Sequence, residues 1–361
     1  MPRVLVLSSS FPTPEDPLLG IFVLEFARAV APHADIAVVH LERRDDVRGV
    51  SVVRDETAEF PTWHARYPSG PKGVSLVLHA AAAVAGVRAA RRSGFEPDLV
   101  HAHFLPAALP GAFLGLPLVA TEHWSVFLPE DPLPLTPGLR LAARIAFGKA
   151  RAVLPVSDAL ERAIHAVVPG ARTTVVRNVV DTALFHPGGE PQPGRLLSVG
   201  AFYEAKGQDL LLDAMRDVVR RRPDAHLDLV GYGDLRRELE RRADGLPVTF
   251  HGKLPKHEVA ELMRSAQLFV LPSRWETSGV SAIEALATGV PVVGRPVAAI
   301  PELIGDGDGV LAGPSGLAAA ILEGLERDFD RSAIAARAAE RYGRERIGRQ
   351  LGDVYEKALR G

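Results

Sequence analysis

The chain has no cysteine, so none of its 361 residues can form a disulfide or act as a thiolate nucleophile. It has no excess of one charge either: 42 basic side chains face 44 acidic ones, a net charge of −2. A balanced charge gives no general attraction to nucleic acid, so we expect no nucleic-acid partner. Residues 1–8 are too short for the apolar core of a secretory signal and are typical of a first strand. We therefore expect a cytoplasmic protein.

An uninterrupted apolar run is also missing. The longest apolar stretch, residues 105–120, contains Pro106, Pro110 and Pro117 and is too broken to form a membrane span. An apolar helix-like segment, residues 139–149, is edged by four basic residues. These are Arg140, Arg144, Lys149 and Arg151. We interpret this edge as a solvated helix face, and peripheral docking on a membrane surface is the alternative.

The chain does show a regular alternation of short apolar runs with segments of helical period. One series of runs covers residues 4–7, 36–40, 99–103, 118–121, 152–156 and 173–177. A second series covers residues 196–200, 227–231, 248–251, 268–271, 290–293 and 310–311. Such alternation predicts an α/β fold whose parallel sheets are covered by helices on both faces.

A break in the alternation divides the chain into two similar halves. Residues 186–194 read His-Pro-Gly-Gly-Glu-Pro-Gln-Pro-Gly and offer little that a core could bury. A chain of this length also exceeds one typical core. We therefore predict a Rossmann-like domain over residues 1–186, a linker over 187–194 and a second Rossmann-like domain over 195–340. Residues 341–361 have the apolar spacing of an amphipathic helix.

Charged residues and glycines follow two runs of the second series. Lys206 and Gly207 come after residues 196–200, and Glu276 and Glu284, separated by seven residues, come after residues 268–271. A cation and a glycine turn at a helix start suit a diphosphate, and carboxylates suit sugar hydroxyls because they only accept hydrogen bonds. Since ligands bind beyond the carboxyl ends of parallel strands, these residues predict a nucleotide-sugar site.

Two residues occupy comparable positions in the first half. Gly20 follows the first run and a proline-rich loop, and His123 follows residues 118–121. We expect both on the facing rim of a cleft between the two domains. His101 and His103 share a strand face, and with His123 they could imitate a metal site. We nevertheless predict no metal, because the sequence offers no further ligand at a convincing spacing.

The order and spacing of several segments resemble the retaining glycosyltransferases of family 4, which have the two-Rossmann architecture called GT-B. The resemblance covers most of the chain, and its motifs are weak singly but specific together. They are Asn178-Val-Val-Asp181 with Phe185, Val199-Gly200 through Lys206-Gly207, Val230-Gly-Tyr-Gly-Asp234, Phe250-His-Gly252, the Glu276–Glu284 block ending in Gly289-Val-Pro-Val-Val293, and Pro301-Glu302.

The resemblance implies a role for each matching residue. Lys206 would neutralise the donor diphosphate, Glu276 would contact the transferred sugar, and Glu284 would hold the ribose. His123 would lie near the donor sugar, and with Lys206 and Glu276 it forms the expected catalytic set. The remaining donor-binding residues would be Gly20, Gly200, Gly252, Lys253, Thr277, Ser278, Gly279 and Val280. The last helix, within residues 341–361, would pack back on the N-terminal domain.

One position departs from the family pattern. Most members have an arginine directly after the glycine of the first motif, where this chain has Ala201. That arginine helps to neutralise the diphosphate, so another cation would have to replace it here. Arg274 and Arg295 are the candidates that the sequence offers.

The expected function is transfer of a sugar from a nucleoside diphosphate to an acceptor hydroxyl, with retention of configuration. The expected partners are a nucleotide sugar and an acceptor, which would be a glycan, a lipid-linked molecule or a small molecule bound by the N-terminal domain. We expect no resident cofactor and no metal requirement. Two alternatives stay open, namely a nucleotide-sugar epimerase of the same fold and a non-catalytic nucleotide-sugar binding protein.

Overall fold

The computed structural model describes residues 1–313 and 316–361, which form two compact units. The first unit comprises Met1–Phe127, Leu133–Val179 and Arg344–Gly361, and the second comprises Leu128–Pro132 and Val180–Gly343. Residues 187–194, the predicted linker, thus belong to the second unit, as do residues 180–186. They do so because Val180 donates its backbone N–H to Tyr342 and packs with Phe185 in the core of that unit.

The first unit is built on a seven-stranded sheet of order β3-β4-β2-β1-β5-β6-β7. Its strands are β1 (Arg3–Ser8), β2 (Asp35–Arg43), β3 (Ser51–Asp55), β4 (Thr62–Tyr67), β5 (Leu99–His103), β6 (Leu118–Glu122) and β7 (Ala152–Pro155). Its helices are α1 (Ile21–Val30), α2 (Lys72–Arg92), α3 (Leu105–Gly111), the 3-10 helix η1 (Ser125–Phe127), α4 (Pro137–Lys149), α5 (Asp158–Val167) and α13 (Arg344–Arg360). All neighbouring strands are parallel except β3 and β4.

Two features of this sheet differ from the sequence prediction. Strands β3 and β4 were not predicted, because polar and charged residues interrupt their apolar ones. Such a pattern is expected of β3, which is the edge strand, but β4 lies inside the sheet between β3 and β2. The predicted strand over residues 173–177 is wrong, since the segment forms one isolated bridge, between Thr173 and Val153. The neighbouring strand β7 ends at Pro155, which has no N–H with which to continue the ladder.

The second unit is built on a six-stranded parallel sheet of order β10-β9-β8-β11-β12-β13. Its strands are β8 (Arg195–Val199), β9 (His226–Val230), β10 (Val248–Gly252), β11 (Leu268–Leu271), β12 (Val292–Gly294) and β13 (Gly309–Leu311). Its helices are the 3-10 helix η2 (Glu204–Lys206), α6 (Gln208–Arg221), α7 (Arg236–Arg242), α8 (Lys256–Ser265), α9 (Val280–Ala287), α10 (Ile300–Leu303), α11 (Leu317–Glu326) and α12 (Arg331–Tyr342). Every strand predicted for this half overlaps one of these strands.

Each sheet has the strand order of a doubly wound Rossmann-like fold. The chain begins in the middle of the sheet, winds outwards in one direction, and then returns to wind outwards in the other. The strand order reverses between β1 and β5 in the first unit and between β8 and β11 in the second. We call these places the switch points. They matter because the loops at the carboxyl ends of the two strands diverge there and leave room for a ligand.

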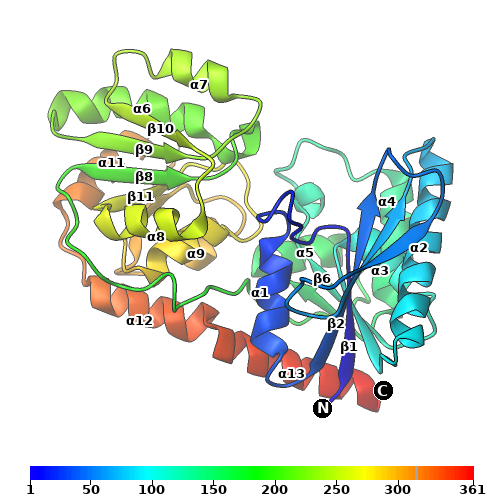
Figure 1. Ribbon diagram of the computed structural model, residues 1–361. Coiled ribbons are helices and arrows are strands. Elements are labelled where there is room, and N and C mark those ends of the chain that lie inside the picture. Colours follow the sequence, from blue (N-terminus) through cyan, green and yellow to red (C-terminus); the bar gives the residue numbers. More distant parts are fainter. Residues whose placement is uncertain (314–315) are drawn as a thin grey trace. The chain divides into compact units, whose positions relative to one another are not determined.

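Helices cover both faces of each sheet (Figure 1). In the second unit, α6 and α11 pack on one face, and α8, α9 and α12 pack on the other. In the first unit, α1 and α13 pack together on one face. Helix α13 comes so close to α1 that a Cβ on Gly348 would lie 2.0 Å from the carbonyl oxygen of Ala29. The predicted α/β architecture of two domains with mainly parallel sheets is therefore confirmed.

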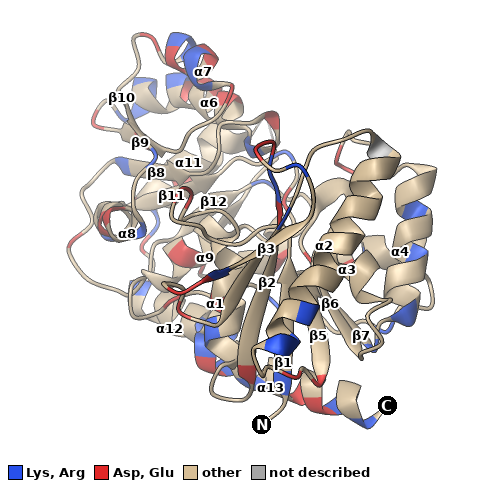
Figure 2. Cartoon of the chain, turned by 45° about the vertical axis from the view of Figure 1, so that its right-hand side comes forward, with Lys and Arg blue, Asp and Glu red and all other residues tan. Residues whose placement is uncertain are grey.

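Helix α2 covers the outer part of the first sheet. It packs against β2 and β4 through small residues, and a Cβ on Gly86 would lie 2.4 Å from the side chain of Val39. Charged residues are interspersed over most helices, but α2 is uncharged over most of its length (Figure 2). Its stretch Gly73–Arg92 is long and apolar enough to cross a membrane, a property it shares with core helices of soluble proteins.

Candidate functional site

The switch point of the second unit brings two loops together. One loop follows β8 and leads through η2 to α6, and the other follows β11 and leads to α9. They are joined where the backbone N–H of Arg274 donates to the carbonyl oxygen of Ala205 at 2.7 Å. Gly207 lies between them in a left-handed conformation, which glycine adopts readily. A side chain would not fit there, since a Cβ would lie 2.3 Å from the carbonyl oxygen of Pro272.

Lys206 and Glu276 meet across these two loops. The ammonium group of Lys206 donates to Oε2 of Glu276 at 2.5 Å, and the carboxylate is buried whereas the lysine is partly exposed. Burial alone would raise the pKa of Glu276, but the charge of Lys206 and its hydrogen bond outweigh it and hold the pKa below the usual value. The structure thus joins two residues that the sequence places 70 positions apart.

Glu284 is the second buried carboxylate of the predicted set. It lies in α9, which begins directly after Gly279, a residue in the left-handed region with φ of 64°. Lys256, at the start of α8, donates to Oε1 of Glu284 at 2.9 Å. Sequence reasoning missed Lys256, although it shows the same signal as Lys206, a lysine close after a strand end and at a helix start, where cations are disfavoured.

The ends of β8, β9 and β10 lie unusually close to one another. Gly200 follows β8, and its carbonyl oxygen would lie 1.9 Å from a Cβ on Gly231. Gly252 ends β10 with φ of 73° and accepts a hydrogen bond from the backbone N–H of Gly231. Lys253 follows, with its ammonium group 5.1 Å from the ring centre of Tyr232. These residues give the second unit a carboxyl edge in which glycine backbone is closely packed.

Arg274 and Arg295 differ in how they are bonded. Arg274 donates two hydrogen bonds to the carboxylate of Asp209, at 2.6 and 2.7 Å, and this pairing lowers the pKa of Asp209. Arg295 donates only to the carbonyl oxygen of Ser273, at 3.2 Å, and its Nε is buried without a partner in the described part of the chain. Arg274 thus has a carboxylate partner, whereas Arg295 has none among the described residues.

Thr277, Ser278 and Val280 lie in the loop after β11 and at the start of α9, whereas two predicted residues, Gly20 and His123, lie in the first unit. Gly20 precedes α1 with φ of 60°, where a Cβ would lie 2.3 Å from the carbonyl oxygen of Ser10. His123 directly follows β6 and is 9% exposed. The ring of Phe22, in the first turn of α1, lies 4.7 Å from the ring of His123, so the segment that Gly20 begins reaches the histidine.

Glu122, next to His123, is fully buried and has a structural task. Its carboxylate accepts three backbone N–H groups, from Leu105, His123 and Trp124, at 2.8 to 2.9 Å. Burial raises the pKa of Glu122 to about 7, although the three hydrogen bonds act in the opposite direction. Glu122 thereby holds the backbone of His123 in place.

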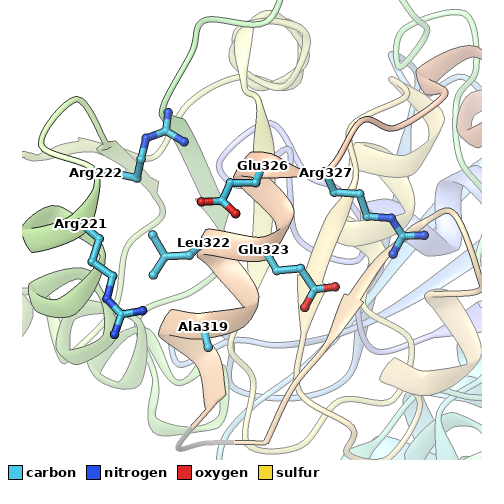
Figure 3. Close-up of a pocket in the computed structure, with 7 residues that line it drawn as sticks. All are labelled: Arg221, Arg222, Ala319, Leu322, Glu323, Glu326 and Arg327. Atoms are coloured by element: carbon cyan, nitrogen blue, oxygen red, sulfur yellow. The ribbon is translucent and has the colours of Figure 1, made fainter.

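A shallow pocket of about 500 Å³ lies between the C-terminal ends of α6 and α11, so it belongs to the amino edge of the sheet (Figure 3). Its lining mixes Arg221, Arg222 and Arg327 with Glu323 and Glu326, so charges of both signs meet there. Within residues 1–313 and 316–361, no three His, Asp or Glu side chains are grouped in a way that could hold a metal ion.

The basic residues that edge α4 have contacts inside the first unit. Arg140 donates to the carbonyl oxygen of Leu135, and Arg144 to that of Val167. The ammonium group of Lys149 lies 4.5 Å from the ring centre of Phe113. Docking of this edge on a membrane surface stays a prediction.

Comparisons with known proteins point to one family. Residues 19–184 match the family model described as Glycosyltransferase Family 4, and residues 193–327 match the model described as Glycosyl transferases group 1. A phosphatidyl-myo-inositol mannosyltransferase from Mycolicibacterium smegmatis is 32% identical over 286 residues, 72% of this chain and 71% of the relative. A sulfoquinovosyl transferase from Arabidopsis thaliana is 27% identical, and the match spans 58% of this chain and only 45% of that enzyme.

Solved structures show the same fold. Sucrose-phosphate synthase from Thermosynechococcus elongatus superposes with a TM-score of 0.79 at 20% identity and covers 99% of both chains. Anabaena HepE, in complex with UDP-glucose, gives a TM-score of 0.73 at 21% identity, with coverage of 99% of this chain and 100% of that one. These named proteins do not favour an epimerase. Because a relative more than 30% identical spans over two thirds of both chains, and two family models match successive halves, this chain belongs to the family 4 glycosyltransferases.

Proposed function

We propose that the chain is a retaining glycosyltransferase that moves a hexose-type sugar from a nucleoside diphosphate to an acceptor hydroxyl and needs no metal ion. The transfer of a sugar is what its relatives do. The observation that carries the finer proposal is the charge arrangement at the switch point of the second unit. Lys206 pairs with Glu276 there, and Lys256 pairs with Glu284.

Lys206 would stabilise the leaving diphosphate. Its ammonium group already neutralises one buried carboxylate and stays partly exposed, so it can face a second anion. The glycine-containing turn at Gly279, which begins α9, would add backbone N–H groups of residues 277–280 to the binding of phosphate or sugar oxygens. In a dry site such fixed charges and dipoles supply most of the stabilisation of developing negative charge.

The two carboxylates would have separate tasks. Glu276 would accept hydrogen bonds from hydroxyls of the transferred sugar, because it shares Lys206 with the diphosphate. Glu284 would accept hydrogen bonds from the ribose, and Lys256 would hold its carboxylate in place. In the first unit, His123 would contact the donor sugar, and Gly20 would let the backbone approach the diphosphate.

Retention would follow from attack on the same face of the sugar that the diphosphate leaves. The bond from the anomeric carbon to the phosphate oxygen breaks, the bond to the acceptor oxygen forms, and the acceptor proton passes to the departing phosphate. The protein would stabilise the charge on that phosphate and exclude water. Cytoplasmic location remains part of the proposal, as does an acceptor bound by the N-terminal domain.

A donor panel tests this proposal. UDP-glucose, GDP-mannose and their nucleoside diphosphates are compared by thermal shift, since a saturating ligand stabilises the folded state measurably. The stabilising donor is then incubated with glycerol, inositol phosphate and simple hexoses, and the anomeric configuration of the product is read by NMR. A retained configuration in the presence of excess EDTA is expected. Inversion, or a loss of turnover that Mg²⁺ restores, contradicts the proposal. Binding without turnover on any acceptor would favour a non-catalytic nucleotide-sugar binding protein.

A further inference from the structure

Helix α2 is an apolar helix that the first unit covers only in part. Its stretch Gly73–Arg92 is long and apolar enough to cross a membrane, yet only 33% of its most apolar part is buried. Core helices of soluble proteins that match it in length and composition are mostly buried. Packing in the core of its own unit therefore does not explain the apolar character of α2.

The uncovered side chains of α2 form a stripe along the helix. Its exposed apolar residues follow one another at steps of three and four positions, and they are Val74, Val77, Ala81 and Val84. Residues at this spacing lie on one face of a helix. The three valines are between 36% and 68% exposed, and Leu76 is exposed beside them. Contiguous exposed apolar side chains of this kind mark a surface that docks on a protein or a membrane.

The opposite face of α2 is fixed to the first unit. A Cβ on Gly86 would lie 2.4 Å from the side chain of Val39, so the helix lies tightly on the sheet. The buried ring of His79 is bonded at 2.9 Å to the hydroxyl of Tyr67 and at 3.0 Å to the carbonyl oxygen of Pro106. Crossing a bilayer would require α2 to leave this packing. A membrane can therefore meet α2 only along the exposed stripe, with the helix in the plane of the surface.

The charged residues of α2 all have one sign. The helix has no acidic residue, and Arg88, Arg91 and Arg92 lie together near its C-terminal end. All three arginines are exposed, and the nearest printed acid, Glu96, lies 3.4 Å from Nε of Arg91. An apolar stripe followed by clustered arginines is the pattern of a helix that lies in a membrane surface, where the arginines meet anionic headgroups.

The same charges disfavour a second copy of the chain as the partner. If two α2 helices packed in parallel along the stripe, Arg88, Arg91 and Arg92 would face their own copies. If they packed antiparallel, the arginines would face the start of the other helix, and residues 66–75 include no acidic residue. Like charges brought together in this way oppose association, whereas an anionic lipid surface attracts them.

We propose that α2 is a docking surface for an anionic membrane, with the apolar stripe in the boundary between headgroups and acyl chains and the arginines at the headgroups. Both the apolar area and the charge then contribute to the affinity. This docking does not depend on the proposed function, because no residue of either switch point takes part in it.

A fluorescent label on the stripe tests the docking directly. The chain has no cysteine, so Val77→Cys carries the only thiol of the full-length protein. With vesicles of equal parts phosphatidylcholine and phosphatidylglycerol, an environment-sensitive dye at this position should shift to the blue and be quenched by spin-labelled lipid. The matched control is Val53→Cys in β3. Val53 is 45% exposed, and it faces away from α2, because its neighbour Val52 pairs with Ala65 on the face that Gly86 contacts. A silent label at Val77, or equal responses at both positions, overturns the proposal.

Sedimentation with the same vesicles measures the two contributions separately. Val74→Ser combined with Val77→Ser should weaken binding on the order of 10-fold, because less apolar surface is removed from water. Arg88→Gln combined with Arg92→Gln should weaken it by roughly 10-fold or more and reduce its dependence on salt. Val53→Ser and Arg349→Gln, which change an exposed valine and an exposed arginine elsewhere in the first unit, should stay within about 2-fold of wild type.

The stripe variants should melt at the temperature of wild type, since the changed side chains are exposed. Wild-type protein that ignores phosphatidylglycerol vesicles refutes the docking surface. A wild-type dimer in analytical ultracentrifugation that Val74→Ser with Val77→Ser dissociates would assign the stripe to a second copy instead.

Discussion

The two units share one topology but have opposite chemistry at their switch points. In the second unit the switch point is ionic, with Lys206, Glu276, Arg274 and Asp209 bonded in pairs. In the first unit it is uncharged, with histidines bonded to one another and to hydroxyls, and with aromatic rings around His123. An ionic edge suits a charged ligand part such as a diphosphate, and a neutral edge with hydrogen-bonding groups suits sugar hydroxyls.

Phe104 marks the neutral switch point as a place of backbone strain. It has φ of 68°, which is unusual for a residue with a large side chain, and it connects β5 to α3. Its N–H bonds to Thr121, and its ring lies 5.0 Å from the ring of His123. Such strain persists where surrounding contacts hold it and is frequent at functional sites. The same doubly wound frame therefore carries two kinds of chemistry at its strand ends, and the side chains of the strand-end loops decide which.

The largest expected effect comes from removing the central charge of the ionic edge. Lys206→Ala should reduce kcat/KM on the order of 10²- to 10³-fold, since a charge pair near 4 Å is worth ~4 kcal/mol at an effective dielectric constant of about 20 and partial exposure lowers this. Lys149→Ala, which removes a lysine of the first unit, is the matched control and should stay near wild type. Steady-state kinetics with the stabilising donor measure both. Near-wild-type turnover of Lys206→Ala would show that the ionic edge is not the diphosphate site.

The next effect concerns the one buried acid of the neutral edge, Glu122. Its pKa in the folded protein, about 7, lies above the ordinary value of 4.5. Between these values the unfolded chain releases the proton and the folded protein keeps it, so stability is full below pH 4.5 and falls as pH rises to about 7. The loss is about 3 kcal/mol at most. Glu122→Gln cannot titrate and should lack this slope. Calorimetric melting of both proteins from pH 4.5 to 8 measures the difference, and a wild type that gains stability over the variant across this range refutes the assignment.

A smaller effect separates the two carboxylates of the ionic edge. Glu284→Ala should weaken binding of the nucleoside diphosphate by roughly 10-fold or more, because hydrogen bonds of a charged group to the ribose are lost. Glu276→Ala should leave that affinity within about 3-fold and weaken binding or turnover of the nucleotide sugar instead. Calorimetry with UDP and UDP-glucose, or GDP and GDP-mannose, resolves the two. Parallel losses in both variants would mean that the carboxylates act as one group.

The smallest effect tests which cation compensates for Ala201. Arg295 has no carboxylate partner in the described structure, whereas Arg274 is held by Asp209. Arg295→Ala should therefore weaken pyrophosphate and nucleoside diphosphate binding by roughly 3-fold and barely change the melting temperature. Arg274→Ala should lower the melting temperature, because it leaves the Asp209 carboxylate unpaired. The reverse pattern, with pyrophosphate affinity lost only in Arg274→Ala, would assign the compensating role to Arg274.

The sequence alone determined the architecture of the chain and the position of the ionic edge. Apolar runs followed by segments of helical period specify parallel strands. Lys206, Gly279 and Glu284 lie in the loops and helices that directly follow two of these strands. These signals are local, because a run of four to six apolar residues in a parallel sheet is buried on both faces whatever surrounds it. Strands β3 and β4 were not predicted because polar and charged residues interrupt such a run in both.

Only the tertiary structure decided which charges and hydrogen bonds are shared. Lys206 bonds to Glu276, and Lys256 bonds to Glu284. The two residues of each pair are far apart in the sequence, and no sequence pattern indicates that they are in contact. His101 and His103 looked like a strand face with an ambiguous chemistry until packing placed Tyr355 of the last helix and His123 beside them. Burial then made these histidines neutral, which no spacing could foretell, because the pKa of a side chain depends on what surrounds it in space.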